Sequence, residues 1–467
     1  MTERKGAFAP FAQKMQDAGL PDVAIRAFKD AYDQLCSGAT GLMRRDELSD
    51  VGELPAAEGL DEASREAGRA ALGQAVVIKL NGGLGTSMGM TQAKSLLVVK
   101  DGLRFLDITA RQMEALASRH GSQVPLVLMN SFRTRDDSLA ALAGYPDLSA
   151  GFATDFLQHR IPRIRAADLT PVAFPESPQH EWCPPGHGDI YTALVTSGLL
   201  EALLAKGRRY AFVSNADNLG AVLDTALLGW FVGSGASFAM EVKRRGEADR
   251  KGGHLARTLD GRLTLREVAQ CPEEELDEFQ DIERYRFFNT NNLWIDLQAL
   301  QELLAARDSV LGLPLIRNEK PVDPEDAASE RVYQLETAMG AAISEFPGAR
   351  AIVVASDRFA PVKTTNDLLR IWSDAYELSD DFRVVPASGS AGDRLFVELD
   401  GAHFKRVPDL EARIPEGPPS LVACRSLTVR GDVRFGRGVK VRGAVEIEAA
   451  PGERVEIADG TTLGEVS

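Results

Sequence analysis

Short apolar runs alternate with longer amphipathic stretches across the middle of the chain. The runs cover residues 75–80, 126–129, 210–214, 238–242, 292–295 and 351–355. Between them, residues 105–119 and 192–206 carry apolar positions at helical spacing. Strands that alternate with helices predict a mostly parallel sheet with helices on both faces. Ligands of such sheets bind beyond the carboxyl ends of the strands, so the loops there are expected to carry the chemistry.

The two ends of the chain have different patterns. Residues 8–35 carry apolar side chains at helical spacing, which predicts a helical N-terminal region over residues 1–72. Near the C-terminus apolar residues recur every six positions, at Leu421, Leu427, Val433, Val439 and Val445. A six-residue repeat with glycine corners predicts a β-helix domain over residues 379–467, and a meander of hairpins is the alternative. Residues 73–378 are then the catalytic domain.

Composition narrows the class of protein. The chain has 467 residues, which predicts two or three domains, and its net charge of -15 disfavours non-specific binding to nucleic acid. The four cysteines form no CxxC pair, so reduced thiols and a cytoplasmic location are expected. Residues 1–5 begin no apolar leader, and no apolar run approaches the roughly 20 residues that span a bilayer. We therefore expect no membrane partner.

A glycine-rich loop follows the first apolar run. It reads Asn81-Gly82-Gly83-Leu84-Gly85-Thr86-Ser87-Met88-Gly89, and glycines let backbone N–H groups approach phosphate oxygens closely. A Walker loop would end in Gly-Lys-Ser/Thr, but Ala93 precedes Lys94, and the dinucleotide fingerprint would need glycine where Met88 stands. Lys94 is placed to reach a triphosphate. A tight turn without a ligand and a solvated surface lysine are the alternatives.

Four further polar motifs have both a chemical and a structural interpretation. His187 lies between two glycines in a loop that begins at Trp182, and either meets a ligand or caps a turn. Asp217 follows a buried strand, where a carboxylate can hold Mg²⁺ or close an Asx turn. Asn289, Asn291 and Asn292 offer amides to sugar hydroxyls or to backbone groups. Lys363 is a second candidate for phosphate binding, beside residues that could simply cap a helix.

Together these motifs resemble the UTP–glucose-1-phosphate uridylyltransferases of eukaryotic type. The resemblance is carried, in the order of that family, by residues 79–89 with 94–95, 129–132, 182–189, 215–220, 289–294, 335–338 and 361–368. It implies a GT-A-like, Rossmann-type catalytic domain with a mixed, mostly parallel sheet and dependence on Mg²⁺. The chain departs from the family at Thr91-Gln92-Ala93, where Lys-Gly-Pro is usual, at Cys183 in place of tyrosine and at Ala216 in place of serine.

The resemblance also implies roles for individual residues. Lys94, Asp217 and Lys363 would be catalytic, with Asp217 as the Mg²⁺ ligand. The nucleotide would contact Leu80, Asn81, Gly82, Gly83, Lys94, Gln158, Gly186, Asp217 and Lys363, with Gln158 reading the uracil. The sugar phosphate would contact Gly82, Gly83, His187, Asn215, Ala216, Asp217 and Asn291.

The implied reaction is formation of UDP-glucose and pyrophosphate from UTP and glucose 1-phosphate by in-line attack on the α-phosphorus. The attacking phosphate is already anionic near neutral pH, so no general base is required. Pyrophosphorylases for other UDP-sugars or for UDP-N-acetylhexosamines stay open as alternatives, as does a catalytically silent sugar-nucleotide sensor. The presence of the three expected catalytic residues, Lys94, Asp217 and Lys363, argues against a catalytically silent sensor. The end of a β-helix could pair with a second copy of the chain, and the sequence does not fix the oligomeric state.

Overall fold

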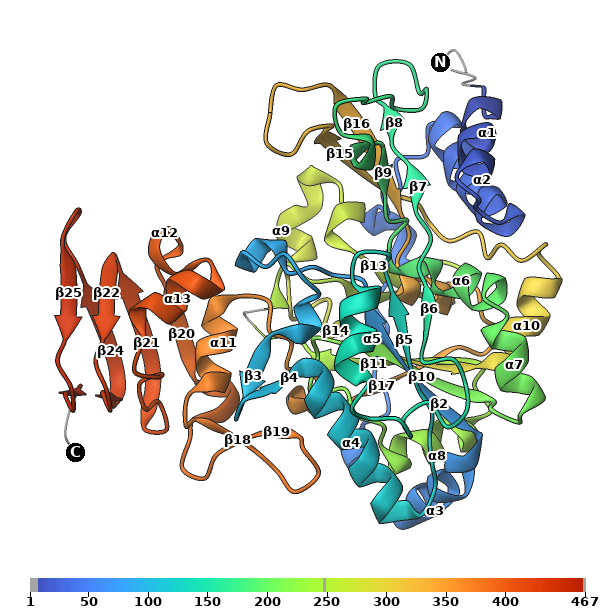
Figure 1. The fold of residues 1–467 in the computed structure, drawn as a ribbon. Coiled ribbons are helices and arrows are strands. Elements are labelled where there is room, and N and C mark those ends of the chain that lie inside the picture. Colours follow the sequence, from blue (N-terminus) through green and yellow to red (C-terminus); the bar gives the residue numbers. More distant parts are fainter. Residues whose placement is uncertain (1–6, 247–248, 465–467) are drawn as a thin grey trace.

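The computed structural model describes residues 7–246 and 249–464 of the chain. A large sheet covered by helices forms the centre of the molecule, and the C-terminal strands extend from it to one side (Figure 1). The first two helices, α1 (Ala9–Asp17) and α2 (Asp22–Cys36), pack at the opposite side. Residues 1–6 and 465–467, which belong to the predicted terminal domains, lie outside the described residues.

The central sheet is mixed, as the resemblance to the family implies, but it is not mostly parallel. Its strands run in the order β1 (Leu48–Ser49), β12 (His254–Thr258), β14 (Phe287–Asp296), β10 (Tyr210–Asn215), β2 (Ala75–Asn81), β5 (Leu126–Asn130) and β6 (Asp155–Leu157), with β13 (Leu263–Arg266) on β12, β11 (Phe238–Arg244) on β14 and β17 (Arg350–Val353) on β11. Neighbours from β10 to β6 are parallel, as predicted, and so are β11 and β17. The long strand β14 is antiparallel to both β10 and β11, which overturns the prediction for that half of the sheet.

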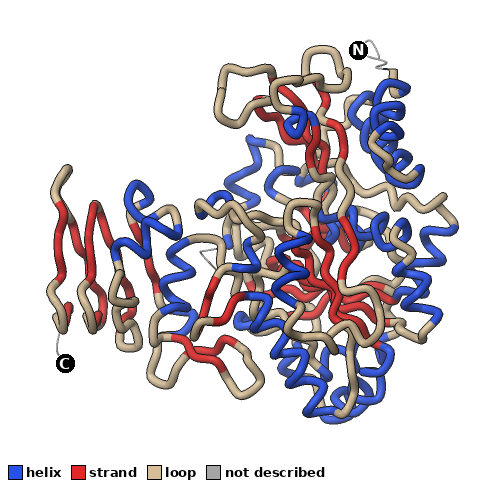
Figure 2. The backbone as a smooth tube through the Cα atoms, in the orientation of Figure 1, coloured by secondary structure: helices blue, strands red, loops and turns tan. Residues whose placement is uncertain are grey.

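Helices cover both faces of the sheet, as the alternating pattern predicts (Figure 2). Val76 and Ile78 of β2 pack toward α6 (Ile190–Thr196), α7 (Leu199–Ala205) and α10 (Leu297–Ala305). Val77 points the other way, toward α3 (Glu62–Ala71), α4 (Phe105–His120) and α8 (Thr225–Ser234). Residues 192–206 do not form the single helix expected, because Gly198 adopts a left-handed φ of 72° and separates α6 from α7.

The C-terminal strands pair in parallel within three small sheets. These are β20 (Phe396–Leu399) with β21 (Cys424–Arg430) and β24 (Gly443–Glu448), β22 (Asp432–Phe435) with β25 (Arg454–Ile457), and β23 (Lys440–Val441) with β26 (Thr462–Leu463). The repeated apolar positions Leu421, Leu427, Val433 and Val439 are all buried at their centre. At the inner end, the Asp374 carboxylate accepts hydrogen bonds from Ser420 Oγ and from the backbone N–H groups of Leu421 and Val422.

The remaining elements surround the central sheet. They are the strands β3 (Val98–Lys100), β4 (Leu103–Arg104), β7 (Ile161–Pro162), β8 (Ile164–Arg165), β9 (Trp182–Cys183), β15 (Ile316–Pro321), β16 (Arg331–Glu336), β18 (Tyr376–Leu378) and β19 (Val384–Pro386), and the helices α5 (Arg135–Leu142), α9 (Leu276–Phe279), α11 (Thr365–Trp372), α12 (Gly401–Phe404) and α13 (Val407–Arg413). Within the described ranges no single helix is long and apolar enough to cross a membrane; the bent pair His187–Thr196 and Leu199–Ala205 passes that test by length and composition only.

Candidate functional site

The glycine-rich loop begins where β2 ends and turns back on itself through two left-handed residues. Gly85 has φ 63° and Gly89 has φ 76°, a region that residues with a side chain rarely adopt. The turn returns the chain so that the Lys94 N–H donates to the Gly83 carbonyl over 3.0 Å. A Cβ atom on Gly85 would lie 3.2 Å from Lys94 Cγ, so glycine there gives the lysine side chain its room.

Most of the predicted site residues line one cavity of about 910 Å³ beyond the carboxyl ends of β2, β5 and β10. Its lining includes Leu80, Asn81, Gly82, Gly83, Lys94, Gln158, Gly186, His187, Asn215, Ala216 and Asp217. These residues are spread over more than 130 positions of the chain. The topology therefore brings together motifs that the sequence only suggested were related.

One wall of this cavity presents the Gln158 side chain, which follows β6. Its Nε2 donates to the Gly186 carbonyl over 2.8 Å, and this bond fixes the orientation of the amide. Gly186 has φ 80°, and a Cβ atom there would lie 2.5 Å from the Thr337 carbonyl oxygen. Gly82 packs against the other end of the amide, since a Cβ atom on it would lie 3.0 Å from Gln158 Oε1. The amide is thus held between two glycines.

His187 is a neutral hydrogen-bond donor. The Met339 backbone N–H donates to its Nδ1 over 2.9 Å, so the ring proton resides on Nε2. Burial lowers the pKa of His187 to about 4, which keeps the ring uncharged near neutral pH. Because His187 also lines the cavity, its Nε2–H can serve a phosphate or hydroxyl oxygen without adding a charge.

Lys94 and Asp217 form an ion pair in the same cavity. Lys94 Nζ lies 2.6 Å from Asp217 Oδ2, and both side chains remain partly accessible. In residues 7–246 and 249–464 no three His, Cys, Asp or Glu side chains gather as a ready metal site. A single accessible carboxylate fits Mg²⁺ bound together with a nucleotide, because Mg²⁺ takes its other oxygens from phosphate and water. To hold such an ion, the Asp217 carboxylate would have to part from Lys94.

Lys363 and Asn291 lie outside the lining of this cavity. Lys363 lines a neighbouring cavity of about 670 Å³ that also contains Lys243, Phe288, Phe359 and Arg370. The two cavities are linked through the backbone, since the Val362 N–H donates to the Asp217 carbonyl over 3.4 Å. Asn291 has φ 58° and exchanges two hydrogen bonds of 2.9 Å with the Asn289 side chain.

The sequence reasoning missed Glu267. Burial raises the pKa of this carboxyl, while a hydrogen bond with Asn289 and the charge of Lys363 act in the opposite direction. A Cβ atom on Gly253 would lie 2.5 Å from a Glu267 oxygen, so Gly253 makes space for the carboxylate. This glycine and the acidic residue directly after β13 were the available signals. Glu267 is therefore hydrogen-bonded to the asparagine motif and lies within the electrostatic influence of Lys363.

An aromatic and cationic rim at the cavity was also missed. Phe132 is 58% exposed and lines the cavity together with Trp182. The Arg160 guanidinium lies between them, 6.0 Å from the Phe132 ring centroid and 4.7 Å from that of Trp182. This rim offers flat apolar surface and positive charge to a bound anionic ligand.

Comparison with known proteins gives consistent results. The family model described as UTP–glucose-1-phosphate uridylyltransferase matches residues 26–442. A protein of that name from Solanum tuberosum is 43% identical over 395 residues, which cover 84% of this chain and 80% of the relative. A solved structure of UDP-glucose pyrophosphorylase from Leishmania major aligns with a TM-score of 0.91 at 44% identity, covering 98% of each chain. The Trypanosoma brucei structure described as UDP-glucose phosphorylase gives 0.89 at 45% identity, again covering 98% of each chain.

Proposed function

Because the chain belongs to the UTP–glucose-1-phosphate uridylyltransferase family, we propose that it forms UDP-glucose and pyrophosphate from UTP and glucose 1-phosphate. The observation that carries the proposal is the single cavity shared by the glycine-rich loop, Lys94, Gln158, His187 and Asp217. It combines groups for a base, a polyphosphate and a second phosphate. One site can therefore hold both substrates of a nucleotidyl transfer.

The uracil would lie between the glycine-rich loop and Gln158. Gln158 Nε2 is engaged by the Gly186 carbonyl, so its Oε1 is the group presented to the base as a hydrogen-bond acceptor. The N3–H of uracil is a donor, whereas N3 of cytosine is an acceptor. This polarity supports recognition of UTP over CTP, and Gly82 supplies a flat contact because a side chain there would meet the amide.

In the transfer step, an oxygen of glucose 1-phosphate attacks the α-phosphorus of UTP. The bond from that phosphorus to the bridging oxygen breaks, and pyrophosphate leaves with the electron pair. Lys94 would neutralise the leaving phosphates, and Asp217 would hold Mg²⁺, which supplies charge neutralisation on the triphosphate when bound. No residue needs to take a proton from the nucleophile, so positioning and electrostatics carry the catalysis.

The sugar phosphate would lie on the side of His187 and Asn215, toward the second cavity. The neutral His187 donates from Nε2, and Lys363 supplies the positive charge that the second phosphate needs. Asn289, Asn291 and Glu267 would receive the sugar hydroxyls, because Asn289 is hydrogen-bonded to both of the others and the charge of Lys363 acts on Glu267. Lys363 is tied to the first cavity by its neighbour Val362, whose N–H donates to the Asp217 carbonyl.

We further propose that the C-terminal strands form a short β-helix and that residues 379–467 act as a separate domain. The three parallel sheets and the buried six-residue repeat support this interpretation. The same reasoning assigns residues 1–72 to a helical region and 73–378 to the catalytic domain.

The end of the β-helix is the surface on which a second copy of the chain would pair. The four unpaired cysteines fit a reaction in the cytoplasm.

The test is an activity screen that crosses the four nucleoside triphosphates with several sugar 1-phosphates and measures pyrophosphate release with and without Mg²⁺. The proposal expects release to be fastest with UTP and glucose 1-phosphate and to require Mg²⁺. A Lys363→Ala variant should lose about a hundredfold in kcat, with Lys440→Ala on the exposed surface as the control. Tight UTP binding without turnover would instead identify a sugar-nucleotide sensor. Faster turnover of another sugar phosphate would reassign the substrate.

A further inference from the structure

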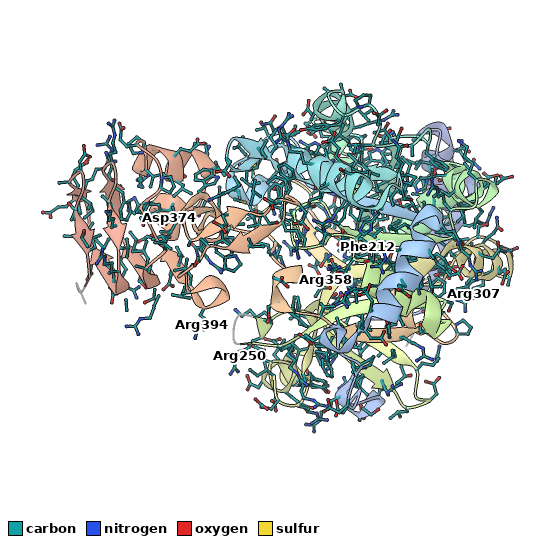
Figure 3. All side chains as sticks on the ribbon, turned by 90° about the horizontal axis from the view of Figure 1, so that it is seen from below. Phe212, Arg250, Arg307, Arg358, Asp374 and Arg394 are labelled. Carbon is teal, nitrogen blue, oxygen red and sulfur yellow. The ribbon has the colours of Figure 1, made fainter. Side chains whose placement is uncertain are left out.

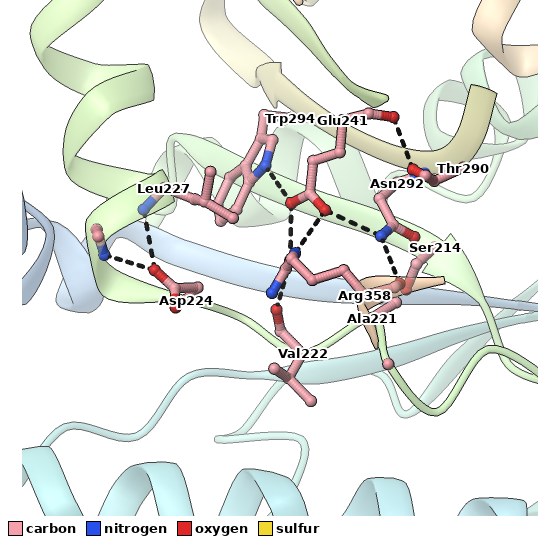
Figure 4. A network of polar contacts seen from close by, with 12 residues as sticks. Ser214, Ala221, Val222, Asp224, Leu227, Glu241, Thr290, Asn292, Trp294 and Arg358 are labelled. Carbon is pink, nitrogen blue, oxygen red and sulfur yellow. Dashed lines mark hydrogen bonds and ion pairs between the residues drawn. The ribbon is translucent and has the colours of Figure 1, made fainter. Parts of the chain in front are cut away.

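A buried ion pair joins strand β11 to the segment that precedes Lys363. The Glu241 carboxylate on β11 is fully buried and accepts hydrogen bonds from Trp294 Nε1, Asn292 Nδ2, and the Nε and a terminal nitrogen of Arg358 (Figure 4). The negative charge of Glu241 offsets the cost of burying the Arg358 cation. The guanidinium lies 5.8 Å from the Phe212 ring centroid. Both residues are labelled near the centre of the molecule in Figure 3. Arg358 is fixed to the sheet by this network.

Asn218 connects this network to the loop that carries Asp217. Its side chain is only 2% exposed. Its Nδ2 donates to Asn292 Oδ1 over 3.2 Å and to the Arg358 carbonyl over 3.1 Å. Its Oδ1 accepts from the N–H groups of Gly220, over 3.2 Å, and Ala360, over 3.0 Å. Both donors and both acceptor positions of the amide are therefore used.

These bonds join two segments that lie 140 residues apart. On one side Asn218 directly follows Asp217, the proposed metal ligand. On the other side the Arg358 carbonyl and the Ala360 N–H lead into Pro361, Val362 and Lys363, and Asn218 pairs with Pro361 as an antiparallel bridge. The Val362 N–H donates in turn to the Asp217 carbonyl. The separation of Asp217 from Lys363 is therefore set jointly by these backbone contacts and by the Asn218 side chain.

We propose that Asn218 is a positioning residue for nucleotidyl transfer, acting by holding the Asp217 loop and the Lys363 segment in one register on the Glu241–Arg358 pair. This inference rests on the proposed function. Two phosphates held on opposite sides must meet in line, and a displacement of about 1 Å can cost on the order of a hundredfold in rate. The UTP cavity wall formed by Gln158 and Gly82 does not depend on Asn218.

The test compares Asn218→Ala with Gln112→Ala. Gln112 is a matched control because it is also a buried amide that donates twice, to the carbonyls of Leu219 and Phe382, and so anchors the same loop without touching residues 358–363. Steady-state kinetics well below the unfolding temperature and hydrogen–deuterium exchange of the Ala360 and Val362 amides are measured for both variants. Both variants should unfold at a lower temperature than the unchanged chain.

We expect Asn218→Ala to lower kcat tenfold or more, to leave the KM for UTP within about twofold, and to accelerate exchange at Ala360 and Val362. Gln112→Ala should retain kcat and the slow exchange. Equal losses of kcat in both variants, or unchanged exchange at Ala360 in Asn218→Ala, would overturn the inference. If the unchanged chain forms no UDP-glucose, the proposed function and the catalytic role of Asn218 both fail, whereas the exchange measurement still decides whether Asn218 couples the segments.

Discussion

Lys94 Nζ lies 2.6 Å from Asp217 Oδ2, so the residue proposed for the phosphates neutralises the residue proposed for the metal. Lys94 and Asp217 form an ion pair in a cavity that both side chains line. When UTP and Mg²⁺ bind together, Lys94 would exchange the Asp217 carboxylate for a phosphate, and Asp217 would exchange the Lys94 ammonium for Mg²⁺. The pair thus holds both side chains in place before the substrates arrive.

Removal of the Lys94 ammonium should separate its two effects, which are competition with the metal ion for Asp217 and neutralisation of the leaving phosphates. In Lys94→Met the Asp217 carboxylate loses its competitor, so the nucleotide-free protein should bind Mn²⁺, used as a spectroscopic stand-in for Mg²⁺, more tightly. The same variant should lose on the order of a hundredfold in kcat, because the leaving phosphates lose a cation. Lys363 lines the neighbouring cavity, so the Lys363→Met variant serves as the control and should leave Mn²⁺ affinity unchanged. Weaker Mn²⁺ binding in Lys94→Met would contradict the competition.

Selection of the base should depend on the oxygen of Gln158. In Gln158→Leu the acceptor is lost but the volume is nearly kept, so we expect the KM for UTP to rise about tenfold or more, since an unpaired polar group of the base must then be buried. Selectivity for UTP over CTP should fall by a comparable factor, while kcat at saturating UTP changes less. Competition kinetics with the two nucleotides measure this ratio. An unchanged ratio would move base recognition to the backbone of the glycine-rich loop.

The neutral state of His187 gives the fold a defined response to acid. Its pKa is about 4 in the folded chain and about 6.5 when unfolded, so the unfolded chain binds more protons between these values. The free energy of unfolding should therefore fall as the pH falls from about 6.5 toward 4, by on the order of 1–3 kcal/mol from this residue. Denaturant unfolding of the unchanged chain and of His187→Gln, which cannot titrate, measures the difference. Parallel pH profiles for the two proteins would show that His187 does not contribute.

The sequence predicted the parallel half of the sheet and most of the cavity for a common physical reason. Strands such as β2, β5 and β10 are short, apolar and followed by polar loops, so both the strand and its exit loop can be recognised locally. The motifs that follow them meet because parallel strands present their carboxyl ends on one edge of a sheet. Leu80, Lys94 and Asp217 line one cavity for that reason.

Features that depend on long-range pairing escaped prediction. Strand β14 has the same apolar texture as β10, and periodicity does not tell an antiparallel from a parallel neighbour. The break between α6 and α7 depends on the left-handed turn at Gly198 within an otherwise helical pattern. Glu267 was missed because its role comes from the neighbours Asn289 and Lys363, which approach it only in the folded chain.

Glu267 should act on the sugar phosphate and not on the nucleotide. Its carboxyl is hydrogen-bonded to Asn289 and is influenced by the charge of Lys363, which lines the second cavity, and burial raises its pKa. In Glu267→Gln the acceptor for sugar hydroxyls is weakened and Lys363 loses a nearby negative charge. We expect the KM for glucose 1-phosphate to rise about tenfold or more and the KM for UTP to stay within about twofold, because charge-assisted hydrogen bonds are roughly twice as strong as neutral ones. Initial-rate measurements with each substrate varied in turn separate the two constants. Glu274→Gln, on a surface glutamate paired with Arg44, is the control. An equal rise in both KM values would show that Glu267 supports the shape of the whole site instead of contacting the sugar.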